Sequence, residues 1–175
     1  GGQYLGTFQG HISYVTSVCP VPDFRCIVSS SSDHTLRVWN PESDESLRTL
    51  EGHASYVSCV FLNANVRCAV SGSNDHTLRI WDIDSGQCLR TLHGHNGSIT
   101  SVVLTPDGQR AVSGSGQAVG SRDQTLRLWD LGSGRCLQIL HGHTEDICCV
   151  CIAPDGHSAV SGSDDHTLRV WDLVS

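Results

Sequence analysis

The chain has 175 residues, enough for one domain with a substantial hydrophobic core. Its formal net charge of −7 argues against a protein that grips a nucleic-acid backbone, because such proteins carry a basic surface. No apolar run approaches the ~20 residues of a membrane-spanning helix. We therefore expect neither nucleic acid nor a membrane among the partners.

Nine cysteines, an odd number, are spread along the chain. Cys148, Cys149 and Cys151 lie in the apolar run ICCVCI, and Cys26 and Cys68 occupy one repeated position. Thiols embedded in apolar strands are typical of a reducing compartment. We therefore predict reduced cysteines, no metal or other cofactor, and a cytoplasmic protein, with the nucleus as the alternative.

Four copies of one motif account for the whole chain. Each copy begins with Gly-His and ends with Trp-Asp or Trp-Asn, and the His-to-Trp separation is 28 residues in three copies and 34 in the third. The period is 42 residues, so the third copy is six residues longer than the others. We treat residues 1–175 as one unit with repeats at about 10–51, 52–93, 94–141 and 142–175.

Each repeat predicts four β-strands, which the second repeat illustrates in chain order. Residues 56–62 (YVSCVFL) are apolar and β-prone, and residues 67–73 follow after a short turn. Residues 77–82 alternate in the manner of a half-buried strand, and residues 88–92 follow a Ser-Gly turn. Because no helical period is visible, we predict an all-β fold.

The extra residues of the third repeat, GQAVGS at 116–121, fall between its second and third strands. They partly copy the preceding VSGS, so the second strand has two alternative registers. The spacing from Pro106 favours Ser113 at the repeated serine position, whereas the other register would place Val119 there. We expect a mobile, glycine-rich loop without chemistry of its own.

The two ends of the chain are complementary in the repeat. Residues 1–9 align with the fourth strand that precedes Gly94-His95, whereas the last repeat stops just after its third strand. We expect residues 1–9 to be a fourth strand that closes the last sheet, in the same chain or in a partner chain.

The Gly-His and Trp-Asp brackets, the SGSxDxTLRxWD core and the 42-residue period resemble the WD-repeat family over essentially the whole chain. The resemblance implies a β-propeller of four-stranded antiparallel blades around a central channel. Because four blades are few for this family, we predict that two chains form a homodimeric ring of eight blades. A fragment of a longer propeller is the alternative.

Each repeat also contains His, Ser, Asp and Trp in a fixed order. A His–Ser–Asp set invites the hypothesis of a nucleophilic triad, but an active site is rarely repeated four times. The resemblance implies instead a structural hydrogen-bond network in each blade. The members are His11, Ser29, Asp33 and Trp39; His53, Ser71, Asp75 and Trp81; His95, Ser113, Asp123 and Trp129; and His143, Ser161, Asp165 and Trp171.

The network predicts that the Gly-His loop and the Asp turn lie at the same end of each blade, which we call the network end. The resemblance implies that partners bind there. Exposed aromatic residues favour recognition, and the acidic residues of the last repeat suit a basic peptide. The candidate binding residues are Tyr14, Tyr56, Ser98, Gln117, Arg122, Glu145, Asp146 and Asp164.

These observations favour a non-enzymatic scaffold that presents a rigid propeller face to protein or peptide partners. The alternatives are a lectin-type or small-ligand-binding propeller, the propeller region of a large signalling protein, an enzyme with the insertion as its active-site loop, and a protein amplified or designed for assembly alone. Only Tyr14 and Tyr56 recur as a lectin would require, and the insertion lacks His, Cys, Asp and Glu.

Overall fold

The fold is all-β, as predicted. A computed structural model describes residues 2–21, 26–43, 45–63, 68–118 and 121–174, and only the backbone of 117–118 and 121–122. The strands form three four-stranded antiparallel sheets, one three-stranded sheet and one two-stranded hairpin. None of the described residues belongs to a helix, so none offers a helical membrane span.

The large sheets follow one another along the chain, one per repeat, and we call them blades one to four. Blade one contains β1 (Val15–Pro20), β2 (Ile27–Ser31), β3 (Leu36–Trp39) and β4 (Ser46–Leu50). Blade two contains β5 (Val57–Asn63), β6 (Cys68–Ser73), β7 (Leu78–Asp82) and β8 (Cys88–Leu92). Blade three contains β9 (Ile99–Leu104), β10 (Arg110–Ser115), β13 (Leu126–Asp130) and β14 (Cys136–Leu140). Blade four contains β15 (Ile147–Ile152), β16 (Ser158–Ser163) and β17 (Leu168–Asp172).

Short turns with characteristic residues join the strands of each blade. In blade three Pro106-Asp107-Gly108 joins β9 to β10, and the Asp107 carboxylate accepts the N–H of Gln109 at 3.0 Å. Gly108 has a φ of 68°, which glycine adopts without strain. The equivalent turns of the first two blades lack this glycine, from which we expect a different turn geometry; they fall at 22–25 and 64–67 and lie outside the described residues.

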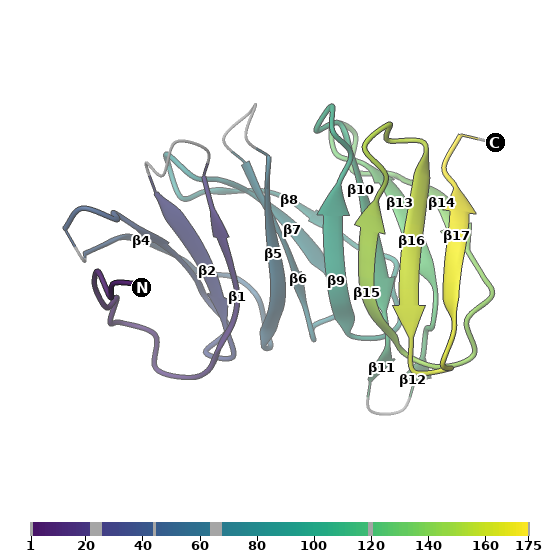
Figure 1. The fold of residues 1–175 in the computed structure, drawn as a ribbon, viewed down its shortest axis with the longest axis horizontal. Helices are drawn as coiled ribbons and strands as arrows, with labels where there is room; N and C mark the ends of the chain where they lie inside the picture. The colour runs from purple at the N-terminus through teal and green to yellow at the C-terminus, as the bar shows by residue number, and fades with distance from the viewer. Residues whose placement is uncertain (1, 22–25, 44, 64–67, 119–120, 175) are drawn as a thin grey trace.

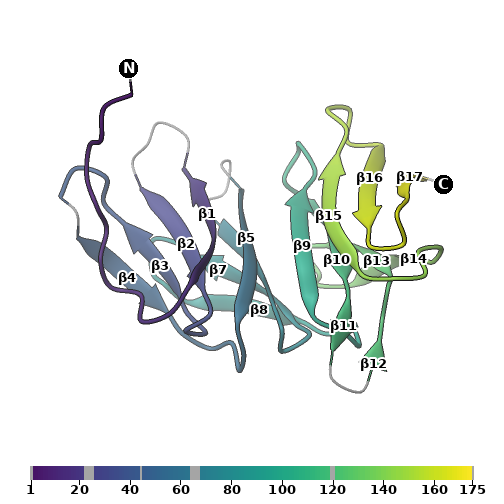
Figure 2. The same cartoon turned by 60° about the horizontal axis from the view of Figure 1, so that its bottom comes forward.

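The four blades stand in a row in chain order, with the N-terminus beside blade one and the C-terminus on blade four at the far end (Figures 1 and 2). The hydrophobic core lies between neighbouring blades. Leu36 and Val38 of blade one pack with Val57 and Val60 of blade two, and equivalent clusters join the later blades. The row of the single chain is open, and the ring of two chains that the sequence predicts stays a prediction.

The insertion forms a hairpin, where the sequence predicted a mobile, glycine-rich loop. β11 (Gln117–Ala118) pairs antiparallel with β12 (Ser121–Arg122), and residues 119–120 lie outside the described residues. The hairpin projects from the end of blade three (Figure 1). Strand β10 pairs Ser113 with Arg127 of β13, which is the register favoured by the spacing from Pro106.

The ends of the chain do not meet each other. Residues 2–9 form no strand and pass beside blade one, where the Phe8 ring lies 5.7 Å from the Trp39 ring. Among the described residues, no strand pairs with the outer side of β17. The completion of the last blade by residues 1–9 therefore stays a prediction.

The nine cysteines are all free thiols in this structure. Cys148 and Cys151 have the Cys-x-x-Cys spacing of many metal sites. However, the Cys148 thiol donates to the Asp164 carboxylate at 2.9 Å, whereas the Cys151 thiol contacts the carbonyl of Val160 at 3.8 Å. The described part of the chain brings together no three potential metal ligands.

Candidate partner-binding surface

The network end of every blade is built around the same four side chains. In blade two His53 Nδ1 lies 2.7 Å from Asp75 Oδ2, and His53 Nε2 lies 2.8 Å from Ser71 Oγ. The indole nitrogen of Trp81 lies 2.8 Å from the same Ser71 oxygen. The structure brings together the equivalent four residues in blades one, three and four, with all distances between 2.6 and 2.8 Å.

Elementary hydrogen-bond chemistry gives the network a direction. The Trp81 indole can only donate, so Ser71 Oγ accepts from it. The Asp75 carboxylate can only accept, so His53 donates from Nδ1 and keeps Nε2 as an acceptor for the Ser71 hydroxyl. Every polar atom of the four side chains is thereby used while the imidazole is neutral, and the network is fully satisfied.

Each network carboxylate also holds two stretches of backbone. Asp75 Oδ2 accepts the N–H of Ala54 at 2.9 Å, and its Oδ1 accepts the N–H and hydroxyl of Thr77 at 2.9 and 2.6 Å. Burial alone would raise the pKa of Asp75, but the hydrogen bonds from His53, Thr77 and Ala54 outweigh it and hold the pKa well below its usual value. The carboxylate therefore stays ionised and ties the Gly-His loop to the Asp turn.

Burial shifts the pKa of the network histidine of blade three downward, whereas it shifts the pKa of a network aspartate upward. Burial lowers the pKa of His95 below its ordinary 6.5, because the charged form is costly in an apolar setting. The hydrogen bond to Asp123 opposes this shift without cancelling it. His95 is therefore neutral at pH 7, as the direction of the network requires.

The order Ser–His–Asp has the connectivity of a catalytic triad, but its serines cannot reach a substrate. Their exposed fractions are 4% for Ser29, 0% for Ser71 and Ser113, and 1% for Ser161. Each hydroxyl oxygen also accepts a tryptophan N–H. A nucleophile needs an open face toward the scissile bond. The arrangement suits a rigid structural element.

The residue after each network aspartate takes an unusual backbone conformation that sequence reasoning did not identify. His34, His76, Gln124 and His166 have φ values of 72°, 70°, 52° and 67°. This left-handed region is uncommon for residues other than glycine. The sequence signal for this conformation is the histidine that follows the aspartate in three repeats. It indicates a role in the turn but does not specify the backbone conformation.

The two tyrosines of the predicted surface are both exposed at the network end, but their environments differ. Tyr56 is 52% exposed, and its ring lies 5.5 Å from the ring of His34 in the preceding blade. Tyr14 is 84% exposed. Within this chain, no blade precedes blade one and could offer it an equivalent histidine. Tyr56 is thus part of a blade junction as well as part of the surface.

The predicted residues of blade three are Ser98 and two residues of the inserted hairpin. Ser98 is half-buried, and its carbonyl accepts the N–H of Gly116 at 3.0 Å and the Ser115 hydroxyl at 3.0 Å. The backbones of Gln117 and Arg122 pair across the inserted hairpin, whereas their side chains lie outside what the structure describes. The hairpin places both residues at the network end, beside Ser98.

The acidic residues of blade four lie together at the network end. Glu145 and Asp164 are exposed, and Asp146 is half-buried. The Asp164 carboxylate accepts the Cys148 thiol, and this hydrogen bond is the main cause that raises the pKa of Cys148 to about 11. Among the described residues, no donor reaches the buried Oδ1 of Asp146. Blade four therefore presents a locally anionic surface.

A second set of repeated polar contacts joins the blades and was missed by sequence reasoning. The Thr16 hydroxyl donates to the carbonyl of Val57 in the next blade, and Ser58 donates in the same way to Ile99. Thr100 donates to Ile147, and the fourth equivalent position is Cys148. A hydroxyl recurring at the second residue of the first strand in three of the four blades was the signal that could have revealed these contacts.

Comparison with known proteins agrees with this geometry. The family described as WD domain, G-beta repeat (WD40) matches residues 2–40, 44–82, 86–130 and 134–172. Among curated proteins, the transcriptional repressor tup12 of Schizosaccharomyces pombe is 41% identical over 46 residues, which make up 26% of this chain and 8% of that protein. The similarity to tup12 thus concerns a small part of both chains. Because the matched segments span nearly the entire sequence, the chain belongs to the WD40 family.

Proposed function

We propose that this protein is a non-enzymatic scaffold that binds protein or peptide partners at the network end of its blades. WD40 repeats generally serve as such scaffolds. We place its action in the cytoplasm, with the nucleus as the alternative that the similarity to a transcriptional repressor favours.

One observation carries the proposal: the backbone of the network end is the same in all four blades, whereas the side chains that it presents differ. The networks of the four blades have the same geometry, whereas the position three residues after the network histidine reads Tyr14, Tyr56, Ser98 and Asp146. The backbone at this position is fixed, since its carbonyl accepts an N–H from the opposite turn at 2.9 to 3.0 Å in every blade. Different side chains on a rigid backbone are typical of recognition surfaces.

The partner that suits blade four is a basic peptide. Glu145 and Asp164 are exposed, and Asp146 lies between them in the fold. Lys or Arg side chains of a partner would meet these carboxylates directly, and the charge would chiefly steer association and select partners.

A fluorescence anisotropy titration with a labelled Lys/Arg-rich peptide tests this function. We expect binding that weakens with added salt and that is lost or strongly reduced in the double variant Glu145→Gln, Asp164→Asn. The control variant Glu42→Gln, Asp155→Asn changes the net charge equally but lies at the opposite end of the blades. Equal losses in the two variants would mean that the peptide responds only to overall charge.

We propose further that two copies of the chain close an eight-bladed ring. The side of blade four that faces away from blade three carries Leu168 and Val170, both largely exposed. The side of blade one that faces away from blade two carries Val15 and Val18, also exposed. These positions are the repeat equivalents of the residues that fill the interior blade junctions, so the two end faces are complementary in composition and register.

Light scattering coupled to size-exclusion chromatography tests closure. We expect the mass of two chains, that is, twice 18.8 kDa, over a wide range of protein concentration. A soluble species with the mass of one chain at high concentration would exclude the ring and leave the binding function of the network end unaffected.

A further inference from the structure

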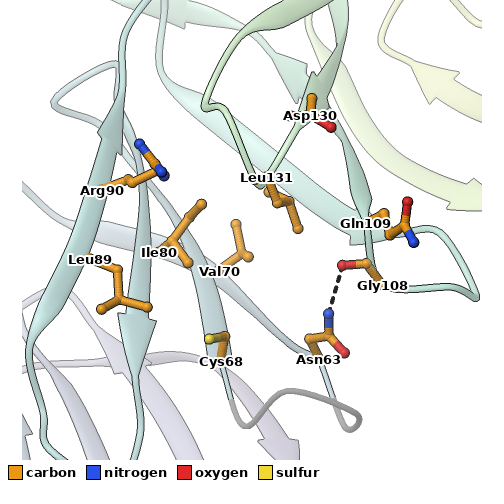
Figure 3. A pocket seen from close by; sticks show the side chains of 11 residues that line it. Asn63, Cys68, Val70, Ile80, Leu89, Arg90, Gly108, Gln109, Asp130 and Leu131 are labelled. Carbon is orange, nitrogen blue, oxygen red and sulfur yellow. Dashed lines mark hydrogen bonds between the residues drawn. The ribbon is translucent and has the colours of Figure 1, made fainter.

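A pocket lies between blades two and three at the end opposite the network end (Figure 3). Its volume is about 360 Å³. Blade two supplies side chains from β6, β7 and β8, and blade three supplies the turns around Gly108 and Leu131. Neither the hydrogen-bond networks nor ring closure uses this pocket, so what it binds is a separate question from the proposed function.

The pocket has an apolar floor and a fixed lower edge. Val70 and Ile80 are buried beneath it, and Leu89 and Leu131 face it from the two blades (Figure 3). At the lower edge Asn63 Nδ2 donates to the carbonyl of Gly108 at 2.7 Å, which joins blade two to blade three. The site is therefore formed before any ligand arrives, as is common for ligand pockets.

A single cationic group at the rim is available to a ligand. Arg90 is exposed on β8, and none of the described residues forms an ion pair with it. Asp130 lines the same pocket, but its Oδ1 accepts the backbone N–H of Ser133 at 2.7 Å and the Ser133 hydroxyl at 2.5 Å. The carboxylate is held by its own turn and the Gln109 amide is uncharged, so the guanidinium is the charged group that remains for recognition.

We propose that this pocket binds a peptide segment in which a large aliphatic side chain adjoins a carboxylate, such as Leu-Glu. The volume lies at the lower end of the range for small-ligand sites and suits one large side chain. The aliphatic group displaces water from Leu89 and Leu131, above the buried Val70 and Ile80, and the carboxylate receives charge-assisted hydrogen bonds from Arg90. Recognition thus needs both groups within one or two residues of each other.

The junction between blades one and two contains a related but smaller pocket. It measures about 280 Å³ and presents Val38, Leu47 and Arg48 at the positions of Ile80, Leu89 and Arg90. The pKa of Asp82 is lowered chiefly by hydrogen bonds from Ser85 and also by the charge of Arg48. Arg48 therefore already interacts with a carboxylate of the chain.

At the third junction the equivalent residue is Gln138. We therefore assign the primary site to the pocket of Arg90, the secondary site to that of Arg48, and no anionic specificity to the position of Gln138.

The probe for this site is the peptide acetyl-Ser-Leu-Glu-Ser-amide, titrated into the isotope-labelled chain and followed by methyl NMR. We expect the resonances of Val70 and Ile80 to shift on binding. The analogue with Gln in place of Glu should bind about tenfold more weakly, which is the usual effect of losing one hydrogen bond to a charged group.

Three variants separate specific from general effects. Arg90→Gln should weaken binding of the Leu-Glu peptide about tenfold, and Leu89→Ser should weaken it severalfold. Arg169→Gln removes the same charge from blade four, which does not line the pocket, and it should leave the affinity unchanged. Equal losses in Arg90→Gln and Arg169→Gln, or shifts confined to residues of the network end, would overturn the proposal. The network-end function has its own probe and variants, so the two proposals fail independently.

Discussion

The interior blade junctions and the two end faces of the row present the same residues in opposite environments. Val60 and Val102 are 5% and 6% exposed inside the row, whereas the equivalent Val18 on the free side of blade one is 62% exposed. Leu78 is 0% exposed, whereas the equivalent Leu168 on the free side of blade four is 76% exposed. A blade therefore does not have a core of its own, and its hydrophobic residues are buried only by a neighbouring blade.

The polar contacts also differ between the interior junctions and the free end faces. Inside the row Thr16, Ser58 and Thr100 each donate a hydroxyl to a backbone carbonyl of the next blade. The fourth equivalent, Cys148, donates instead to Asp164 within its own blade. A ring closed by two copies would thus have junctions of two kinds, with a hydroxyl at the interior ones and a thiol at the closing ones.

The largest expected effect comes from introducing a carboxylate at equivalent positions of an interior blade junction and of a free end face. Val60→Asp buries a carboxylate without a partner, so we expect the chain to lose its cooperative thermal transition. Val18→Asp lies on an exposed face, so we expect it to change the stability of one chain by no more than about 0.5 kcal/mol. Circular dichroism melting and light scattering together make the test. The second variant should be folded and monomeric, and if it remains a dimer, blade one does not take part in closure.

The next largest effect concerns the hydrogen-bond networks. Asp75→Ala in blade two leaves the buried His53 and the exposed N–H of Ala54 without this partner, and we expect a loss of about 2–3 kcal/mol, because an unpaired buried group such as the His53 imidazole costs about 1–3 kcal/mol. Asp165→Ala in blade four should cost less, because the free side of that blade admits water. Chemical denaturation of both variants gives the two losses. Similar losses would show that the network is equally closed to water in both blades.

The pH dependence of the stability of the folded chain tests the buried networks without any substitution. The pKa of His95 is lowered in the folded chain, so below about 6.5 the unfolded chain binds the additional proton and stability falls as the pH decreases. The pKa values of Asp75 and Asp123 are also lowered, so their contribution is complete above the unfolded value of about 3.9 and is lost progressively below it. Denaturation between pH 8 and 3 should show both phases, and His95→Gln should remove the phase near neutral pH.

Much of this architecture could be predicted from the residues. The Gly-His and Trp-Asp spacing predicts the sheets, and the period predicts which His, Ser, Asp and Trp belong to one blade, because local hydrogen-bond geometry repeats with the sequence. The pocket at Arg90 could not be predicted, because its walls come from strands and turns some 40 residues apart in two blades. The inserted hairpin was missed for a different reason, since the glycine-rich sequence between Gly116 and Ser121 lacks the alternation that signals strands.

The smallest expected effect concerns the thiol at the proposed closing junction. By equivalence with Thr16, Ser58 and Thr100, a hydroxyl at position 148 would meet the carbonyl of Val15 in a second copy. Cys148→Ser should therefore tighten the dimer about fivefold, since a new hydrogen bond contributes ~1 kcal/mol. Sedimentation equilibrium of this variant, with Cys151→Ser as the control on the same strand, measures the difference. If both variants tighten the dimer equally, the gain comes from general polarity, and if Cys148→Ser weakens it, the bond to Asp164 is itself part of the closed junction.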